Sequence, residues 1–191
     1  MAEKGNINFP LNGIQVLTGL EPIRKRPWMY VPKDDPQLAS KLLANCLEYA
    51  ESDGATRAAI NLYPGGRATV GYNAPMPTEK RHDRYTIERR LGELHAGGAP
   101  TFEPFPEAGG LPVTVGLCSE FEAVIEDGER EWGLKYVRGV LEVPFEMVGS
   151  SAFRSTTFDL QLDTEILPNV DFDKAFLREW AAPCLIDIEV L

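Results

Sequence analysis

The chain has 191 residues and a formal net charge of -10, and 43% of its residues are hydrophobic. This length is enough for one domain with a substantial core, and the acidic balance argues against direct DNA binding, which needs a basic face for phosphates. Three scattered cysteines and two histidines exclude a disulfide framework and a histidine-rich metal centre, and no apolar run approaches the roughly 20 residues of a membrane span, so we expect a cytoplasmic protein.

The first half of the chain predicts a helix followed by a β-hairpin. Residues 35–54 begin with Asp-Pro, a good N-cap followed by a residue suited to the first helical position. Apolar side chains then recur at helical spacing as far as Gly54, a typical helix stop. Two β-like runs, 56–63 and 67–72, come next and are separated by Pro-Gly-Gly.

The second half adds further helices and strands. Residues 85–94 predict a short charged helix, and a long loop follows over 99–110. Residues 113–118 fit either a helix or a strand. The other expected elements are a hairpin of 121–126 and 132–137 around Asp-Gly, a strand over 156–162, a helix over 171–181 capped by Asp171, and a half-exposed strand over 186–190. The order predicts an α+β fold, a two-layer sandwich with a mixed, mostly antiparallel sheet covered on one face by helices.

Four motifs then occur in the order found in one protein family. GIQVLTGLEPIRKRPWMYV, ending at Val31, resembles VLxGLExVRKRPGMYIG, the N-terminal signature of the ATPase subunits of DNA gyrase and topoisomerase IV. The others are LHAGG at 94–98, Gly-Gly-Leu at 109–111 (like the start of GGLHGVG), and Ser-Thr-Thr at 155–157 (like the GT strand motif). The resemblance implies the ATP-binding fold shared by gyrase B, Hsp90, histidine kinases and MutL, with ATP between a helical layer and a mixed sheet.

The residues that this family uses for hydrolysis are replaced in this chain. The family carries a general-base glutamate and, four residues later, a magnesium-binding asparagine on the same helix face. One alignment places Leu42 and Cys46 at these positions, and a shift of one residue places Lys41 and Asn45 there. Leucine and lysine cannot act as this base, and a thiol is a poor magnesium ligand. Two nearby carboxylates are expected to face solvent: Glu48 and Glu51.

The adenine and phosphate motifs are also altered. The family's DDGRGIP corresponds to GYNAPMP at 71–77, where Tyr72 replaces the adenine-binding aspartate and Asn73 remains a candidate acceptor for adenine. In the phosphate loop Pro112 removes one N–H donor, and β-branched residues stand at inner positions. We therefore expect a degenerate copy that does not hydrolyse ATP.

The resemblance nevertheless implies a nucleotide site, with ATP and magnesium as cofactors, although the replaced residues argue against both. No catalytic residue or metal ligand is assigned. The positions that the match assigns to nucleotide are Asn45, Asn73, Gly97, Gly98, Gly109, Gly110, Gly116 and Thr156. The expected organisation is an N-terminal arm over 1–13 and a gyrase B-like domain over 14–191, without the transducer and later domains that topoisomerase activity requires.

Three functions stay open at this point. The chain could be a truncated gyrase B-like domain that still binds nucleotide, a nucleotide-free module that modulates gyrase through protein contacts, or an inactive relic. The family dimerises by exchanging N-terminal arms, so the partners implied are a second copy or gyrase subunits, and the acidic surface suits a basic protein partner. Phe102 and Phe105 either form a partner-binding patch or fill a vacated ATP cavity, and Trp28 either packs or plugs part of that site.

Overall fold

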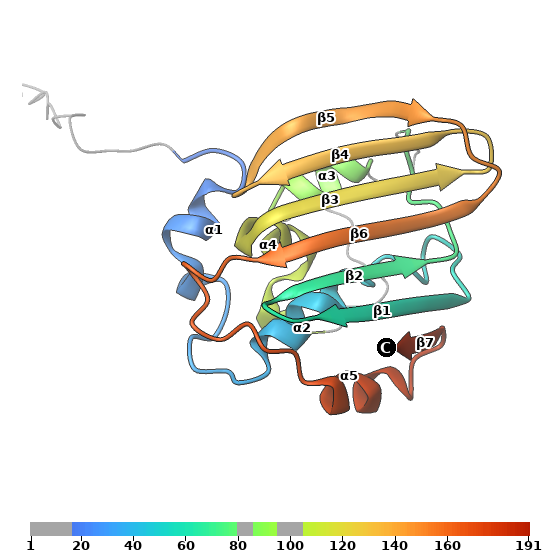
Figure 1. Ribbon diagram of the computed structural model, residues 1–191. Coiled ribbons are helices and arrows are strands. Elements are labelled where there is room, and N and C mark those ends of the chain that lie inside the picture. The colour runs from blue at the N-terminus through green and yellow to red at the C-terminus, as the bar shows by residue number, and fades with distance from the viewer. Residues whose placement is uncertain (1–16, 80–85, 95–104) are drawn as a thin grey trace, which may run out of the picture.

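A computed structural model describes residues 17–79, 86–94 and 105–191, and its backbone forms one sheet with helices on one face (Figure 1). The strands are β1 (Arg57–Tyr63), β2 (Arg67–Tyr72), β3 (Cys118–Asp127), β4 (Glu131–Val137), β5 (Val140–Gly149), β6 (Arg154–Leu162) and β7 (Asp187–Val190). Their order across the sheet is β5-β4-β3-β6-β2-β1-β7. All neighbours run antiparallel except β1 and β7, which are parallel.

The helices lie behind this sheet and at its ends (Figure 1). They are α1 (Glu21–Lys25), α2 (Leu38–Asn45), α3 (Ile87–Gly92), α4 (Gly110–Leu117) and α5 (Lys174–Ala181), with single 3₁₀ turns η1 (Pro27–Met29) and η2 (Pro106–Ala108). Helices α2, α3 and α4 cover one face, and α5 lies beside the edge strand β7. Within the described ranges, no helix is long and apolar enough to cross a membrane.

The core forms where alternate strand residues meet the helices. Ile60 in β1, Val70 in β2 and Phe158 in β6 are fully buried on the helix-covered face. The residues directly before and after each of them in its strand are partly or fully exposed. The rings of Phe121 and Phe158 lie 5.4 Å apart across β3 and β6. The predicted fold class, a two-layer α+β sandwich with a mixed sheet, is therefore confirmed.

Several predicted elements are found, with shifted bounds. Both hairpins and the final strand form where the alternation placed them, and residues 113–118 belong mainly to helix α4. The last helix begins later than expected, because Asp173 rather than Asp171 provides its cap by accepting the Phe176 N–H at 2.9 Å. Strand β5 was not predicted.

The helix expected over 35–54 is also shorter than predicted. Asp35 accepts the backbone N–H of Gln37 at 2.9 Å, and the helix itself begins at Leu38 and ends at Asn45. Residues 46–48 continue through hydrogen bonds to carbonyls three residues earlier, which tighten the chain into turns. After these turns, the carboxylate of Glu48 reaches the backbone N–H of Leu111.

The basic run near the N-terminus has a structural role through its first member. Arg24 donates from Nη1 to the carbonyls of Gly116 and Cys118, each at 3.0 Å, and forms an ion pair with Asp163. It therefore joins α1 to the C-terminal end of α4, where cations are favoured. Burial alone would raise the pKa of the Asp163 carboxyl, but hydrogen bonds from Arg24 and from the Glu165 backbone lower it below its ordinary value.

We predict that Arg24→Met destabilises the protein by about 3 kcal/mol at pH 7, because it leaves the Asp163 carboxylate without its cation at a site where that side chain is 2% exposed. Urea unfolding measures the loss. Lys25→Met is the control, since Lys25 pairs with Glu21 on the surface, and its effect should stay within about 0.5 kcal/mol.

The same pair predicts a pH dependence. The pKa of Asp163 is lower in the folded state than its value of 3.8 in the unfolded state. The ionised Asp163 therefore stabilises the fold fully above pH 3.8, and this stabilisation is lost as the pH falls through the pKa of the folded state. The difference between the wild type and Arg24→Met should therefore be largest at neutral pH and shrink below about pH 4. An equal difference at pH 7 and pH 3 would contradict this account of the ion pair.

Candidate functional site

Two of the stretches that the motif match assigns to nucleotide are fixed by hydrogen bonds within the protein. The segment after β2 is hydrogen-bonded to β6, and the segment that leaves α2 is hydrogen-bonded to the start of α4. The site therefore has two sides, one around residues 72–76 and one at the N-terminus of α4.

On the α4 side, a carboxylate of the protein occupies the helix N-terminus. Glu48 is 5% exposed and its Oε2 accepts the backbone N–H of Leu111 at 2.7 Å. Unpaired N–H groups and the helix dipole make such a terminus attractive to anions, including phosphates. The prediction that Glu48 faces solvent is wrong, because α2 ends early and the turn after it directs this side chain inward. Glu51 is exposed, as predicted.

The glycines at this end have close protein neighbours. Gly110 has a φ of +76°, and a Cβ there would lie 3.0 Å from Oε2 of Glu48. Gly109 has a φ of +72°, and a Cβ on Gly116 would lie 3.0 Å from atoms of Ile23 in α1. Gly109 and Gly110 thus suit their left-handed conformations, and a Cβ at position 109 would also lie 2.7 Å from Cγ2 of Val113. At Gly116 the close approach of Ile23 favours a residue without a side chain.

On the other side lies a buried polar network. Tyr72 is 3% exposed and its hydroxyl donates to Oδ2 of Asp53 at 3.0 Å. Arg90 donates from Nη1 to both carboxylate oxygens of Asp53, at 3.0 and 2.9 Å, with side-chain exposures of 3% and 0%. The guanidinium also lies 4.1 Å from the centre of the Tyr49 ring. Burial, followed by the charge of Asp53, raises the pKa of Tyr72 well above its ordinary value, so the hydroxyl stays a donor.

Thr156 fastens the segment that follows β2. Its Oγ1 accepts the Met76 N–H and donates to the Ala74 carbonyl, each at 2.8 Å, and both Thr156 and Met76 are buried. Asn73 follows the last residue of β2, at the open end of the β1–β2 hairpin. Its Oδ1 accepts the N–H groups of Thr56 and Arg57 at 2.9 Å. The amide of Asn73 is therefore engaged with the start of β1.

The positions aligned with the catalytic pair do not provide a base. Leu42 is fully buried, and burial raises the pKa of the Cys46 thiol well above its ordinary value, so that thiol is neutral. In the shifted alignment, Lys41 forms ion pairs with Asp35 and Glu107 at 2.8 Å. The chain thus has no proton acceptor at either aligned position.

Asn45 provides the one oxygen at the aligned metal position. Its Nδ2 donates to the Ala108 carbonyl at 3.1 Å, and its buried Oδ1 has no hydrogen-bond partner. Across the described residues, no group of three or more His, Cys, Asp or Glu side chains could hold a metal ion. The resemblance implies one asparagine oxygen as the protein ligand of magnesium, and Asn45 Oδ1 supplies it, but Glu48 occupies the helix terminus where the phosphates that complete the coordination of the ion would lie.

Some predicted residues have other outcomes. Phe105 packs on α5, with ring centroids 5.4 Å from Phe176 and 6.0 Å from Trp180, and its two predicted roles stay predictions. Trp28 lies on η1 and is 37% exposed, and its two predicted roles stay predictions. Four predicted features lie outside the described residues: the arm over 1–13, Gly97, Gly98 and Phe102.

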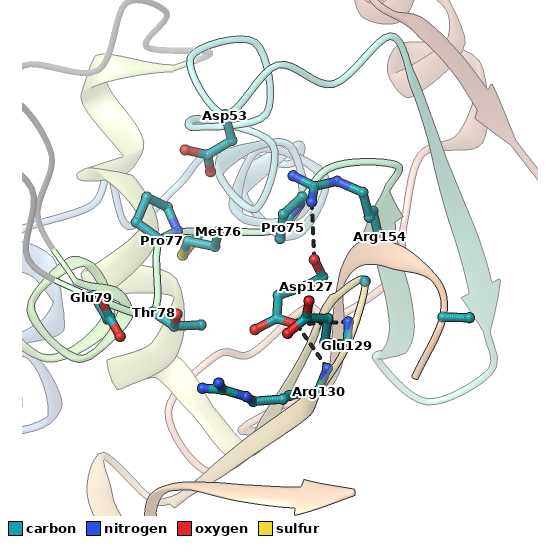
Figure 2. Close-up of a pocket in the computed structure, with 12 residues that line it drawn as sticks. Asp53, Pro75, Met76, Pro77, Thr78, Glu79, Asp127, Glu129, Arg130 and Arg154 are labelled. Atoms are coloured by element: carbon teal, nitrogen blue, oxygen red, sulfur yellow. Dashed lines mark hydrogen bonds between the residues drawn. The ribbon is translucent and has the colours of Figure 1, made fainter. Parts of the chain in front are cut away.

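A cavity of about 630 Å³ opens beside the buried network (Figure 2). Its wall is formed by Asp53, residues 75–79, the β3–β4 turn at 127–130, and Ala152 with Arg154. Arg154 donates to the Asp127 carbonyl at 3.0 Å, and the carboxylate of Asp127 accepts backbone N–H groups within its own turn. Asp53, the ion-pair partner of Arg90, therefore lies at the wall of a cavity that is lined largely by polar and charged groups.

The comparisons with known proteins agree on one group of relatives, although no protein-family model matches the chain. The DNA gyrase B protein of Clostridium acetobutylicum is 28% identical over 185 residues, covering 91% of this chain and 29% of that protein. The DNA gyrase B protein of Metamycoplasma hominis is 30% identical over 180 residues, covering 86% and 28%. The DNA topoisomerase 4 B protein of Mycoplasma capricolum is 29% identical over 192 residues, covering 94% and 29%.

A solved structure shows the same fold. The 43K ATPase domain of Thermus thermophilus gyrase B, crystallised with an aminocoumarin, aligns with a TM-score of 0.65 and 23% identity over 85% of this chain and 44% of that one. The chain spans less than a third of the length of the curated relatives it matches.

We predict that Arg90→Met costs about 3–5 kcal/mol of stability, because it leaves the buried carboxylate of Asp53 without its cation. Adding Asp53→Asn should recover part of the loss, since the charge is removed with its partner. The neighbouring Arg89→Met is the matched control, because Arg89 pairs with Glu93 on the surface. Equal losses for Arg89→Met and Arg90→Met in urea unfolding would refute this role of Arg90.

Proposed function

Since the chain is a relative of the B proteins of DNA gyrase and topoisomerase IV, as its motifs predicted, we propose that it is a gyrase B-like module that neither binds nor hydrolyses ATP. It acts instead through contacts with other proteins. The domain organisation that goes with this proposal is an arm over 1–13 and a pseudo-ATPase domain over 14–191.

The single observation that carries the proposal is the carboxylate of Glu48 on the N–H of Leu111. In the motif match, the start of α4 is where phosphates would bind. A phosphate there meets a fixed negative charge instead of free N–H donors, and at close range like charges repel strongly in a poorly hydrated site. Phosphate binding at this terminus would therefore require the Glu48 side chain to leave its buried position.

The adenine side supports the same proposal. Tyr72 stands where the resemblance requires an aspartate that accepts from adenine, and its hydroxyl donates to Asp53. Pro75 stands where the family motif has its second glycine, and Thr156 bonds the backbone on both sides of it, at Ala74 and at the buried Met76. A nucleotide base would have to displace these groups. Hydrolysis would further need a base, which Leu42 cannot be.

The proposed activity is therefore binding to protein partners, with gyrase subunits as the first candidates. Relatives of this chain are named as subunits of DNA gyrase and topoisomerase 4. The net charge of -10 favours a partner with a basic surface and disfavours DNA as the direct target. The alternative is a fragment that still responds to nucleotide, and a direct titration separates the two.

We expect calorimetric titration of the folded chain with a non-hydrolysable ATP analogue and magnesium to give no saturable heat up to millimolar ligand. A gyrase B ATPase domain serves as the positive control in the same buffer. Saturable binding at micromolar to low-millimolar concentration would favour the nucleotide-responsive alternative.

We further expect the chain to change the rate of DNA supercoiling by purified gyrase in a dose-dependent way, because a partner-binding copy competes for subunit contacts. Heat-unfolded chain is the control for nonspecific effects. No change in rate, together with no binding to either of the two gyrase proteins by sedimentation, would leave the relic as the better description.

A further inference from the structure

Strand β5 forms one edge of the sheet and bears an unusual share of exposed apolar side chains. It lies at the end of the strand order, and β4 is its only strand neighbour among the described residues (Figure 1). Four of its apolar residues are between 39% and 67% exposed: Val140, Leu141, Met147 and Val148. An edge strand offers unpaired backbone groups to another strand, and exposed apolar side chains on it indicate a surface that a partner covers.

The sequence of β5 and the glycine before it is nearly symmetric about its proline. Residues 139–149 read GVLEVPFEMVG, and the residues equally distant from Pro144 belong to the same chemical class. The matched pairs are Gly139 with Gly149, Val140 with Val148, Leu141 with Met147, Glu142 with Glu146, and Val143 with Phe145. A two-fold interface requires this kind of match, because each residue i that contacts j is repeated as j contacting i.

We propose that β5 pairs antiparallel with β5 of a second copy, about a two-fold axis at Pro144, which joins the two sheets edge to edge. In this register every exposed apolar residue meets an apolar residue of the other copy. A shift of two residues in either direction places Glu142 or Glu146 against a valine. The interface is distinct from residues 1–13, and it goes beyond the proposed lack of nucleotide binding.

The same register opposes Glu142 of each copy to Glu146 of the other, twice by symmetry. Directly opposed like charges weaken strand pairing. The proline and the irregular β4–β5 register also limit edge pairing, as prolines and bulges do on other edge strands. The pairing is therefore weak at neutral pH, and these two glutamates control its strength.

Charge reversal at these two positions provides the test, with sedimentation velocity over a concentration series at pH 7 as the measurement. Glu142→Lys converts both Glu–Glu contacts into Lys–Glu contacts and should tighten the dimer roughly tenfold. Glu142→Lys with Glu146→Lys creates Lys–Lys contacts and should return the affinity to about the wild-type value. Glu122→Lys, on the exposed face of the inner strand β3, is the control for net charge and should have little effect.

The order of affinities distinguishes this proposal from general charge effects. If net charge alone governed association, the double variant would dimerise more tightly than Glu142→Lys, and that order would overturn the proposal. A monomer up to about 1 mM for wild type and Glu142→Lys would also overturn it. A dimer that ignores these changes but disappears when residues 1–13 are removed would assign dimerisation to the arm instead. None of these outcomes bears on nucleotide binding, so the two proposals fail separately.

Discussion

The hydrogen bond between the Glu48 carboxylate and the Leu111 N–H is the contact on which the character of this site depends. It joins the turn after α2 to the N-terminus of α4, the two elements that the motif match assigns to metal and phosphate. The bond satisfies a helix end that would otherwise need water, a side chain or a ligand. A protein anion in this place stabilises the helix and, in our account, makes a bound phosphate unnecessary and unfavourable.

A second protein-internal network stands on the adenine side. Arg90 from α3 and Asp53 from the turn before β1 form a buried pair, and Tyr72 at the end of β2 adds its hydroxyl to the same carboxylate. Buried charges are tolerated when each has a partner and hydrogen bonds, and breaking such a pair is costly. Three elements that could move apart around a ligand are thus held together by contacts among themselves.

Local patterns predicted the parts of the fold that depend on local chemistry. The hairpins follow from alternation and from Pro-Gly-Gly and Asp-Gly turns, and the α5 helix follows from apolar residues four apart. The predicted helix bounds were wrong where tertiary contacts, and not local sequence, determine them. Asp171 and Asp173 are equally good caps in sequence, and no residue near Asn45 is a helix stop that would end α2 there. Strand β5 was missed because its exposed edge lacks a clean alternation of apolar and polar residues.

The residue types at the aligned positions are read directly from the sequence, but the contacts that replace the family's site are not. Absence of the base and of the adenine-binding aspartate is visible in Leu42 and Tyr72 themselves. Glu48 looked like a surface charge because its inward direction arises only from the turn after Asn45. Arg90 carried a weak signal, since it stands between Ile87 and Leu91 on the apolar side of a short helix, but its partner Asp53 is distant in sequence. The assignments of glycines to nucleotide stay predictions.

The most direct test of this account observes the Leu111 amide itself. Two-dimensional ¹H–¹⁵N spectra of the labelled protein, recorded with and without millimolar ATP and magnesium, report on the bond to Glu48 without requiring turnover. If the carboxylate of Glu48 holds this position, the Leu111 and Tyr72 amide signals should not move in the titration. A saturable shift of both signals would show that nucleotide enters the site and displaces Glu48, and would contradict the central claim.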